Sequence, residues 1–224
     1  MTQYGWPQAV VYPALIVAAM TGAALCLAWG WLLAIVEVVL LALLVWALMF
    51  FRDPSRDVPQ DDALLVAPAD GTVTAVETVD CSDICAGPVL RIGIFLSIFN
   101  VHINRAPCRA TVKTITYRQG KYLNAMNPLS GRVNESNTLV LLRAREPKDR
   151  LMIRQISGAI ARRIVCTIRE GQELAPGEKF GMIKFGSRTE LCVPAGEKTK
   201  CLVRVGDKVK AGVTPLVRYG ICQD

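Results

Sequence analysis

The hydrophobic pattern divides the chain into an apolar amino-terminal segment and a longer segment of short, alternating runs. Residues 9–28 and 32–51 form two apolar runs, and Glu37 is the only charged side chain between Thr2 and Phe51. As helices, the runs would each be about 30 Å long, enough to cross the hydrocarbon core of a bilayer. The pattern therefore predicts two transmembrane helices, joined by a tight turn at residues 29–31.

All four tryptophans belong to this segment, and three of them flank the apolar runs, where an interfacial aromatic belt would place them. They are Trp6, Trp29, Trp31 and Trp46. A secretory signal peptide fits poorly, because the segment has no basic start and is far too long. A carboxylate facing lipid is costly, so Glu37 is expected to face the partner helix or the outer interface.

The first basic residues, Arg52 and Arg56, follow directly after the second run. Because positive charge stays on the cytoplasmic side, two crossings of the cell membrane place the amino terminus and everything after Arg52 in the cytoplasm. Residues 1–56 hold Arg52, Arg56, Glu37 and Asp53, which cancel, so the net charge of +7 belongs to residues 57–224. A basic domain behind a short linker would be attracted to anionic lipid headgroups. Nucleic acid is a poorer partner, because the basic residues are scattered along an anchored chain.

Residues 57–224 are rich in short runs of Val, Ile, Thr, Leu and Phe bounded by turn residues, which predicts strands. Strands are expected at residues 64–66, 72–76, 89–99, 111–117, 138–142 and 164–168, and one short helix at 157–163. Residues 171–177 and 206–212 share a glycine-bounded pattern at a spacing of 35 residues, which predicts a turn, a short strand and a turn in each. The predicted fold is β-rich α+β, a barrel-sandwich-like domain behind a pair of transmembrane helices. The hairpins are similar to those of biotinyl and lipoyl domains, but no lysine matches the one modified there.

The eight cysteines carry little functional signal. Cys26 lies in an apolar run, which leaves seven in the domain, and an odd number on the cytoplasmic side favours reduced thiols. Cys81 and Cys85 are four residues apart, but no second Cys/His pair completes a zinc site, so no metal is predicted.

The chain holds the three residue types that activate a hydroxyl nucleophile: Asp70 in an Asp-Gly turn, His102 and Ser187. His102 is the only histidine, so any step that needs an imidazole uses it. On a strand, Asn100, His102 and Asn104 would share one face, which suits the floor of a site. A plain hairpin turn at Asp70 and a half-exposed strand around His102 would explain the same patterns without chemistry.

Ser187 follows Gly186 between two apolar runs, and the hypothesis is that its hydroxyl attacks its own backbone at Gly186. A Ser-Lys pair with Lys184 is a poorer alternative, because a spacing of three on a strand or turn points the two side chains apart. A basic cluster is interpreted as mostly a solvated or lipid-facing surface, one or two of whose members could hold a substrate phosphate. Its members are Arg143, Arg145, Lys148, Arg150, Arg154, Arg162, Arg163 and Arg169.

Six segments, in order along the chain, resemble phosphatidylserine decarboxylase. They are FFRDPSR at 50–56, PADG at 68–71, FNVHINR at 99–105, NESN at 134–137, GAIARRIV at 158–165 and FGS at 185–187. The length and the paired apolar helices resemble the short form of that family. Two features depart from it, since the family commonly has Arg where Ser136 stands and is not known for eight cysteines.

The resemblance implies a self-made prosthetic group. Ser187 Oγ would attack the Gly186 carbonyl and turn the amide into an ester, and elimination and hydrolysis would leave a pyruvoyl group at position 187. Residues 1–186 would become the large chain and 187–224 the small chain of a heterodimer, and a higher oligomer is compatible with this. By the same resemblance Asp70, His102 and Ser187 form the triad for this step, in which His102 takes the hydroxyl proton and Asp70 orients its ring.

The implied reaction converts phosphatidylserine to phosphatidylethanolamine and CO2 through a Schiff base on the pyruvoyl group, which acts as an electron sink. The chain would then be the zymogen of a lyase of phospholipid biosynthesis, working on the cytoplasmic face of the membrane. One alternative is a relative that acts on another serine-headed lipid, such as an archaeal ether lipid. An alternative from another class is a non-enzymatic membrane adaptor with a lipoyl-like barrel, which an uncleaved chain would favour.

Overall fold

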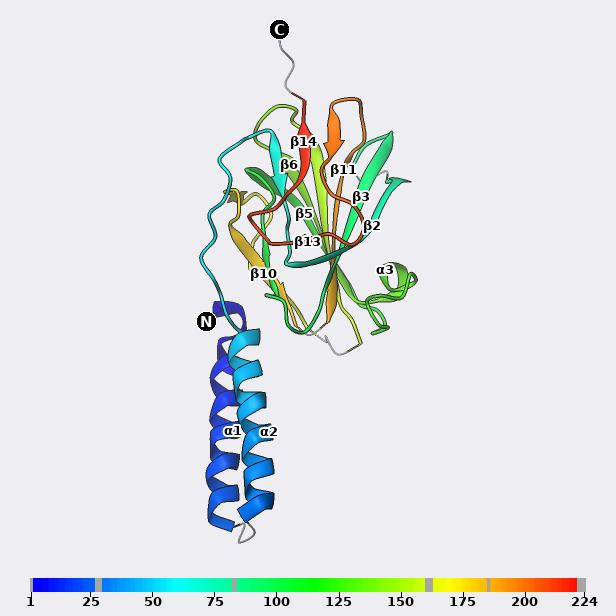
Figure 1. Ribbon diagram of the computed structural model, residues 1–224. Helices are drawn as coiled ribbons and strands as arrows, with labels where there is room; N and C mark the ends of the chain where they lie inside the picture. Colours follow the sequence, from blue (N-terminus) through cyan, green and yellow to red (C-terminus); the bar gives the residue numbers. More distant parts are fainter. Residues whose placement is uncertain (1, 27–29, 82–83, 160–162, 185, 221–224) are drawn as a thin grey trace. The chain divides into compact units, whose positions relative to one another are not determined.

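The computed structural model describes residues 2–26, 30–81, 84–159, 163–184 and 186–220. The chain forms two compact units, Met1–Pro54 and Ser55–Asp224. The first unit is a helical hairpin and the second is a β-rich domain, so the predicted fold class is confirmed (Figure 1).

The hairpin consists of a short 3-10 helix, Gln3–Gly5, followed by α1, Trp6–Cys26, and α2, Gly30–Phe50. Both long helices are apolar enough to cross a membrane, with a mean hydropathy of 2.0 for α1 and 2.8 for α2. Their surfaces are largely exposed, as is expected of helices that lipid would cover. Glu37 is half-buried and one of its carboxylate oxygens is shielded within the hairpin, where the sequence placed it.

The hairpin yields the first prediction. Removing residues 1–49 is expected to release the rest of the chain from membranes, because it deletes nearly all the lipid-compatible surface of the first unit. The measurement is fractionation of cell membranes followed by extraction with alkaline carbonate. The full-length chain should stay in the pellet until detergent is added. If carbonate alone released the full-length chain, the two helices would be attached at the membrane interface and would not span the bilayer.

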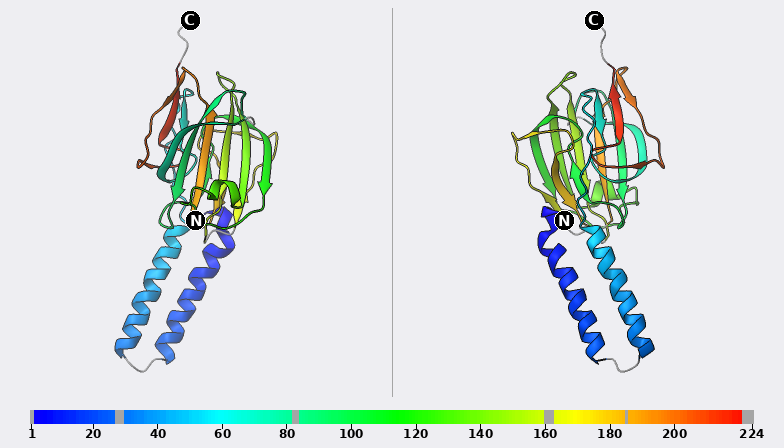
Figure 2. Two further views of the ribbon diagram at one scale, coloured as in Figure 1. Left: turned by 90° about the vertical axis from the view of Figure 1, so that its right-hand side faces the viewer. Right: turned by 60° about the vertical axis from the view of Figure 1, so that its left-hand side comes forward.

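The second unit is built on an eight-stranded antiparallel sheet that curls into a half-barrel, with the strand order β13-β2-β3-β11-β7-β6-β5-β9 (Figure 2). Two three-stranded sheets, β1-β14-β12 and β4-β10-β8, complete the domain. The strands are β1 Leu64–Val66, β2 Gly71–Asp80, β3 Pro88–Leu96, β4 Ile103–Arg105, β5 Ala110–Arg118, β6 Ser136–Arg143, β7 Arg150–Ile156, β8 Ile164–Cys166, β9 Glu173–Leu174, β10 Lys179–Ile183, β11 Ser187–Pro194, β12 Thr199–Cys201, β13 Lys208–Val209 and β14 Pro215–Tyr219. One short helix, α3, spans Ser130–Val133.

The two glycine-bounded repeats form equivalent edges of the long sheet. The first repeat supplies β9, which pairs with β5, and the second supplies β13, which pairs with β2. The glycines that bound them, at 171, 177, 206 and 212, all have positive φ, which glycine adopts at little cost. The predicted turn, short strand and turn is therefore confirmed in both repeats.

Three sequence expectations are corrected by the fold. The strand expected at 89–99 ends at Leu96, because the Asn100 side chain accepts hydrogen bonds from the backbone N–H and the hydroxyl of Ser97 and closes a turn. The helix expected at 157–163 is absent from its described residues, 157–159 and 163, while 160–162 lie outside the described chain. Arg143 is not on the surface, since it is 2% exposed, stacks on the Tyr219 ring at 4.4 Å and donates to the Asp62 carbonyl at 2.6 Å.

Candidate active site

Ser187 begins the strand β11, which lies between β3 and β7 in the long sheet. Its backbone pairs with Leu96, its side chain is completely buried, and within the described chain its Oγ makes no hydrogen bond. A buried hydroxyl without a partner is costly, and such groups call for an explanation in strain or chemistry. Gly186 directly before it has φ of +61°, a left-handed conformation that favours glycine. The chain therefore enters β11 through a glycine turn that ends on a buried hydroxyl without a hydrogen bond in the described chain.

The Gly186 carbonyl packs directly against Gly158, which follows the end of β7. A Cβ added to Gly158 would lie 1.8 Å from the Gly186 carbonyl oxygen, so only a residue without a side chain fits there. Ser157, just before it, is also fully buried, and its carbonyl accepts a hydrogen bond from Asn134 Nδ2 at 2.8 Å. The Ser157-Gly158 backbone thus fixes the position of the carbonyl that Ser187 would attack.

This packing gives a second prediction. Gly158→Ala is expected to push the Gly186 carbonyl away and to slow cleavage of the chain at least tenfold, because small misplacements of reacting groups are costly. The measurement is the rate at which the full-length band is lost after synthesis. Gly196→Ala is the matched control, since nothing lies within 4 Å of its added Cβ. Normal cleavage in Gly158→Ala, in a chain shown to be folded, would contradict the role given to this contact.

His102 is fully buried directly before β4, and the turn closed by Asn100 takes the place of the longer strand expected there. Its Nδ1 lies 2.9 Å from the carbonyl oxygen of Asn100. A carbonyl only accepts hydrogen bonds, so this contact assigns the proton to Nδ1 and leaves Nε2 as the basic nitrogen of the neutral ring. The His102 carbonyl in turn accepts from the backbone N–H of Ile183 at 3.3 Å, four residues before Ser187.

Asn104 ties the segment of His102 to the strand of Ser187. Its amide donates to Thr189 Oγ1 at 3.1 Å and to the Pro68 carbonyl at 3.3 Å, and it accepts from Gln155 at 2.9 Å. The Asn104–Thr189 contact thus brings β4, which His102 directly precedes, against β11, which Ser187 begins.

Asp70 lies in the turn before β2 and is held by two hydrogen bonds. Its Oδ2 accepts from Arg56 at 2.7 Å and its Oδ1 accepts from the backbone N–H of Ala211 at 2.8 Å. The preceding turn contacts β4, since the Pro68 carbonyl also accepts from the Arg105 N–H at 3.0 Å. The fold therefore connects the Asp70 turn to the segment of His102, and it recruits Arg56, which the sequence had assigned to the linker.

Comparison with known proteins decides the family. The family model of phosphatidylserine decarboxylase matches residues 43–216. A phosphatidylserine decarboxylase proenzyme of Rhodopirellula baltica is 47% identical over 190 residues, covering 84% of this chain and 77% of that protein. One of Syntrophus aciditrophicus is 44% identical over 167 residues, covering 75% of this chain and 76% of that protein. The chain belongs to the phosphatidylserine decarboxylase family.

A small cavity accompanies the glycine turn of this phosphatidylserine decarboxylase family member. It has a volume of about 250 Å³ and is lined by Phe95, Ser97, Ile98, Asn124, Ala159 and Gly186. The cavity therefore lies directly beside the turn that precedes Ser187. Among the residues that line it, Asn124 and Ala159 come from segments that the sequence did not connect to the site. Only the fold identifies these two residues as neighbours of the turn, because it brings the loop after β5 next to the end of β7.

Lys184 was the alternative partner for Ser187. Its side chain is buried, and its pKa is lowered by burial and then by the nearby charge of Arg163. A lowered pKa alone does not make Lys184 the base for Ser187. The cysteines take no visible part in the site, and the seven in the described chain are free thiols. Burial raises the pKa of Cys108 and of Cys192 to about 12, so both stay protonated at neutral pH.

Proposed function

We propose that the chain is a phosphatidylserine decarboxylase proenzyme that cleaves itself between Gly186 and Ser187. The observation that carries the proposal is the completely buried Ser187 Oγ, without a hydrogen bond in the described chain, next to a carbonyl fixed by Gly158. A surface Gly-Ser turn would have a solvated hydroxyl and room for side chains around it. Here the hydroxyl is buried, and Gly158 leaves no room for a side chain beside the Gly186 carbonyl. The only imidazole of the chain belongs to His102, whose carbonyl accepts from Ile183, four residues before Ser187.

The proposed cleavage balances with the groups that this site holds. Nε2 of His102 takes the proton of Ser187 Oγ, which attacks the Gly186 carbonyl carbon, and the peptide C–N bond breaks as the Ser187 nitrogen gains a proton. Loss of the Cα proton of residue 187 then expels the Gly186 carboxylate and leaves dehydroalanine. Water adds to its imine form and ammonia leaves, which gives a keto group at position 187. Residues 1–186 and 187–224 remain associated because β11 is paired on both sides, with β3 and with β7.

The substrate is proposed to be phosphatidylserine, and the products phosphatidylethanolamine and CO2. When formed, the pyruvoyl group supplies an electron sink for the bond that releases CO2. The buried surroundings of Ser187 exclude water, and His102 Nε2 is proposed to hold or deliver a proton at the adjacent carbon. Asp70, with its charge balanced by Arg56, is proposed to hold the turn that contacts the segment of His102. The domain is proposed to work on the cytoplasmic face, as the position of Arg52 and Arg56 indicates.

The test is the mass of the purified protein under denaturing, reducing conditions. Two fragments, 1–186 and 187–224, are expected, and the smaller should lack a free amino terminus. Treatment with borohydride should add two hydrogens to the small fragment and abolish release of CO2 from phosphatidylserine. A single uncleaved chain in an active preparation, or a free amine on residue 187, would overturn the proposal.

A further inference from the structure

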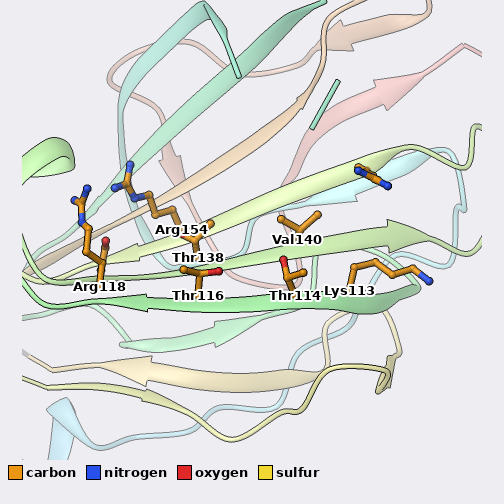
Figure 3. Close-up of a pocket in the computed structure, with 9 residues that line it drawn as sticks. Lys113, Thr114, Thr116, Arg118, Thr138, Val140 and Arg154 are labelled. Atoms are coloured by element: carbon orange, nitrogen blue, oxygen red, sulfur yellow. The ribbon is translucent and has the colours of Figure 1, made fainter. Parts of the chain in front are cut away.

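The outer face of the long sheet carries a basic groove that the proposed reaction does not use. Its volume is about 690 Å³, and it runs over β5, β6 and β7 (Figure 3). The residues that line it are Lys113, Thr114, Thr116, Arg118, Ser136, Thr138, Val140, Arg150 and Arg154. Four of these side chains are cationic and several carry hydroxyls, while none is a carboxylate. We refer to this surface as the basic groove.

The groove lies on the opposite face of the sheet from Ser187. Side chains alternate along a strand, so Ser187, Thr189 and Leu191 share one face of β11. Thr189 contacts Asn104 and Leu191 belongs to the hydrophobic core, so that face points inward. Glu190 lies on the other face and is paired in register with Arg154 of β7. A ligand in the groove would therefore not occupy the proposed decarboxylation site.

Arg118 and Arg154 bring two guanidinium groups to the same end of the groove, above Thr116 and Thr138 (Figure 3). The strand register explains this, because Thr116, Thr138 and Arg154 form one cross-strand row and Arg118 lies opposite Ser136. Arg118 is steadied by hydrogen bonds from Nη2 to the carbonyls of Gly131 and Asn134, at 3.4 and 3.3 Å. The end of the groove thus combines two cations, one of them held by backbone carbonyls, with two hydroxyl groups.

The charges around this end leave a positive surplus. Glu190 forms an ion pair with Arg188 at 2.5 Å, and Arg91 pairs with Glu77 at 2.7 Å. Arg118 and Arg154 are two further cations on this face, and the carboxylate near Arg154 among the described residues is that of Glu190, which also attracts Arg91. The pKa of Arg154 is lowered by burial first, and also by the charges of Arg118 and Arg91. A bound anion would relieve the repulsion between the two guanidinium groups.

We propose that the basic groove binds a phosphate group, with Arg118 and Arg154 as its cationic ligands and Thr116 and Thr138 as hydroxyl donors. Arginine pairs match the several acceptor oxygens of a phosphate, and charge-assisted hydrogen bonds of this kind are the strong ones. The groove is larger than a single phosphate ion, so there is room for the organic part of a phosphate ester towards Lys113 and Arg150. The phosphate could come from an anionic lipid headgroup or from a soluble phosphate.

The test uses the full-length protein in nanodiscs of phosphatidylcholine, with inorganic phosphate as the probe. Hydrogen exchange of peptides from β5, β6 and β7 is expected to slow as phosphate is added, in a saturable manner. In Arg118→Gln and in Arg154→Gln the phosphate concentration for half-protection should rise about ten- to a hundredfold, the loss typical of a charged hydrogen bond. Arg204→Gln is the matched control, because it removes one positive charge from a side chain that is 92% exposed and lies outside the groove.

A second set of nanodiscs, containing phosphatidylglycerol and no free phosphate, separates the two sources. Protection of the same peptides by phosphatidylglycerol, lost in Arg118→Gln, assigns the site to a lipid headgroup, whereas protection by inorganic phosphate alone assigns it to a soluble ester. Arg154→Lys keeps the charge but not the forked geometry, so it should weaken phosphate binding less than Arg154→Gln does. It replaces Arg154→Gln in the test if that variant does not fold. The same binding is expected in Ser187→Ala, so the result is independent of the proposed cleavage. No protection by either probe, or an equal loss in Arg204→Gln, would overturn the proposal.

Discussion

Ser187→Ala is expected to leave the chain whole and to abolish decarboxylation completely. The substitution removes the only hydroxyl adjacent to Gly186 and leaves the carbonyl, the glycine turn and the imidazole in place. Because Ser187 Oγ is buried and has no hydrogen-bond partner in the described chain, its loss breaks no contact there and should not lower the free energy of unfolding. The measurement is the intact mass together with the release of CO2 from phosphatidylserine.

Two further variants show whether the effect lies in the nucleophile. Ser187→Cys and Ser187→Thr keep a nucleophilic atom at the same place and should cleave slowly, over hours to days. Ser187→Thr adds a methyl group to a fully buried position, so part of its lower cleavage rate will come from poorer packing. A thermal unfolding scan measures the loss of stability and so separates the packing effect from the effect on the nucleophile. Cleavage of Ser187→Ala at the normal rate would show that another residue or an external protease cuts the chain.

The sequence was sufficient for the hairpin and for much of the sheet. The two apolar runs were long enough to be recognised by length alone, and the short runs at 64–66, 111–117 and 138–142 lie within observed strands. The strand β11 was not among the expected strands, because the charged Arg188 and Glu190 precede the apolar run that follows Ser187. In the fold both charges are buried and paired with each other, which is an interaction that no periodicity reveals.

The site was predictable in its residues but not in its contacts. His102 stood out as the only histidine, but its place before β4 depends on the Ser97–Asn100 turn, which interrupts the expected strand. The hydrogen-bond donors to Asp70 are 14 and 141 residues away along the chain, at Arg56 and Ala211. Gly158 stood out only as the first residue of the 158–165 segment that carries part of the resemblance, and its importance comes from a backbone contact across the fold. Contacts between distant segments of this kind are set by topology and not by local sequence.

His102→Ala is expected to abolish self-cleavage, and Asp70→Asn to block it or slow it greatly. His102 is the only imidazole, and the contact of its Nδ1 with the Asn100 carbonyl leaves Nε2 as the base. Asp70→Asn removes the carboxylate that balances Arg56, so part of its effect could come from lost stability. Arg56→Gln is the matched control, because it breaks the same ion pair but keeps the negative charge of Asp70. Cleavage should survive in Arg56→Gln if the charge of Asp70 matters, and should fail equally in both variants if only the pair matters.

The two roles separate once the keto group is already in place. This can be arranged by releasing the small chain with a protease and converting its amino-terminal residue chemically to the ketone. Cleavage needs a base at Ser187 Oγ once, whereas each turnover needs a proton donor at nearly the same position. On this pre-formed enzyme His102→Ala should lose about a hundred- to ten-thousand-fold in kcat, the usual contribution of general acid–base catalysis, while Asp70→Asn keeps much of its activity.

His102→Gln fills a similar volume without titrating and should behave like His102→Ala. Equal losses of kcat in the Asp70 and His102 variants would mean that Asp70 acts in every turnover. Full activity in His102→Ala would mean that water or the substrate's own phosphate supplies the proton.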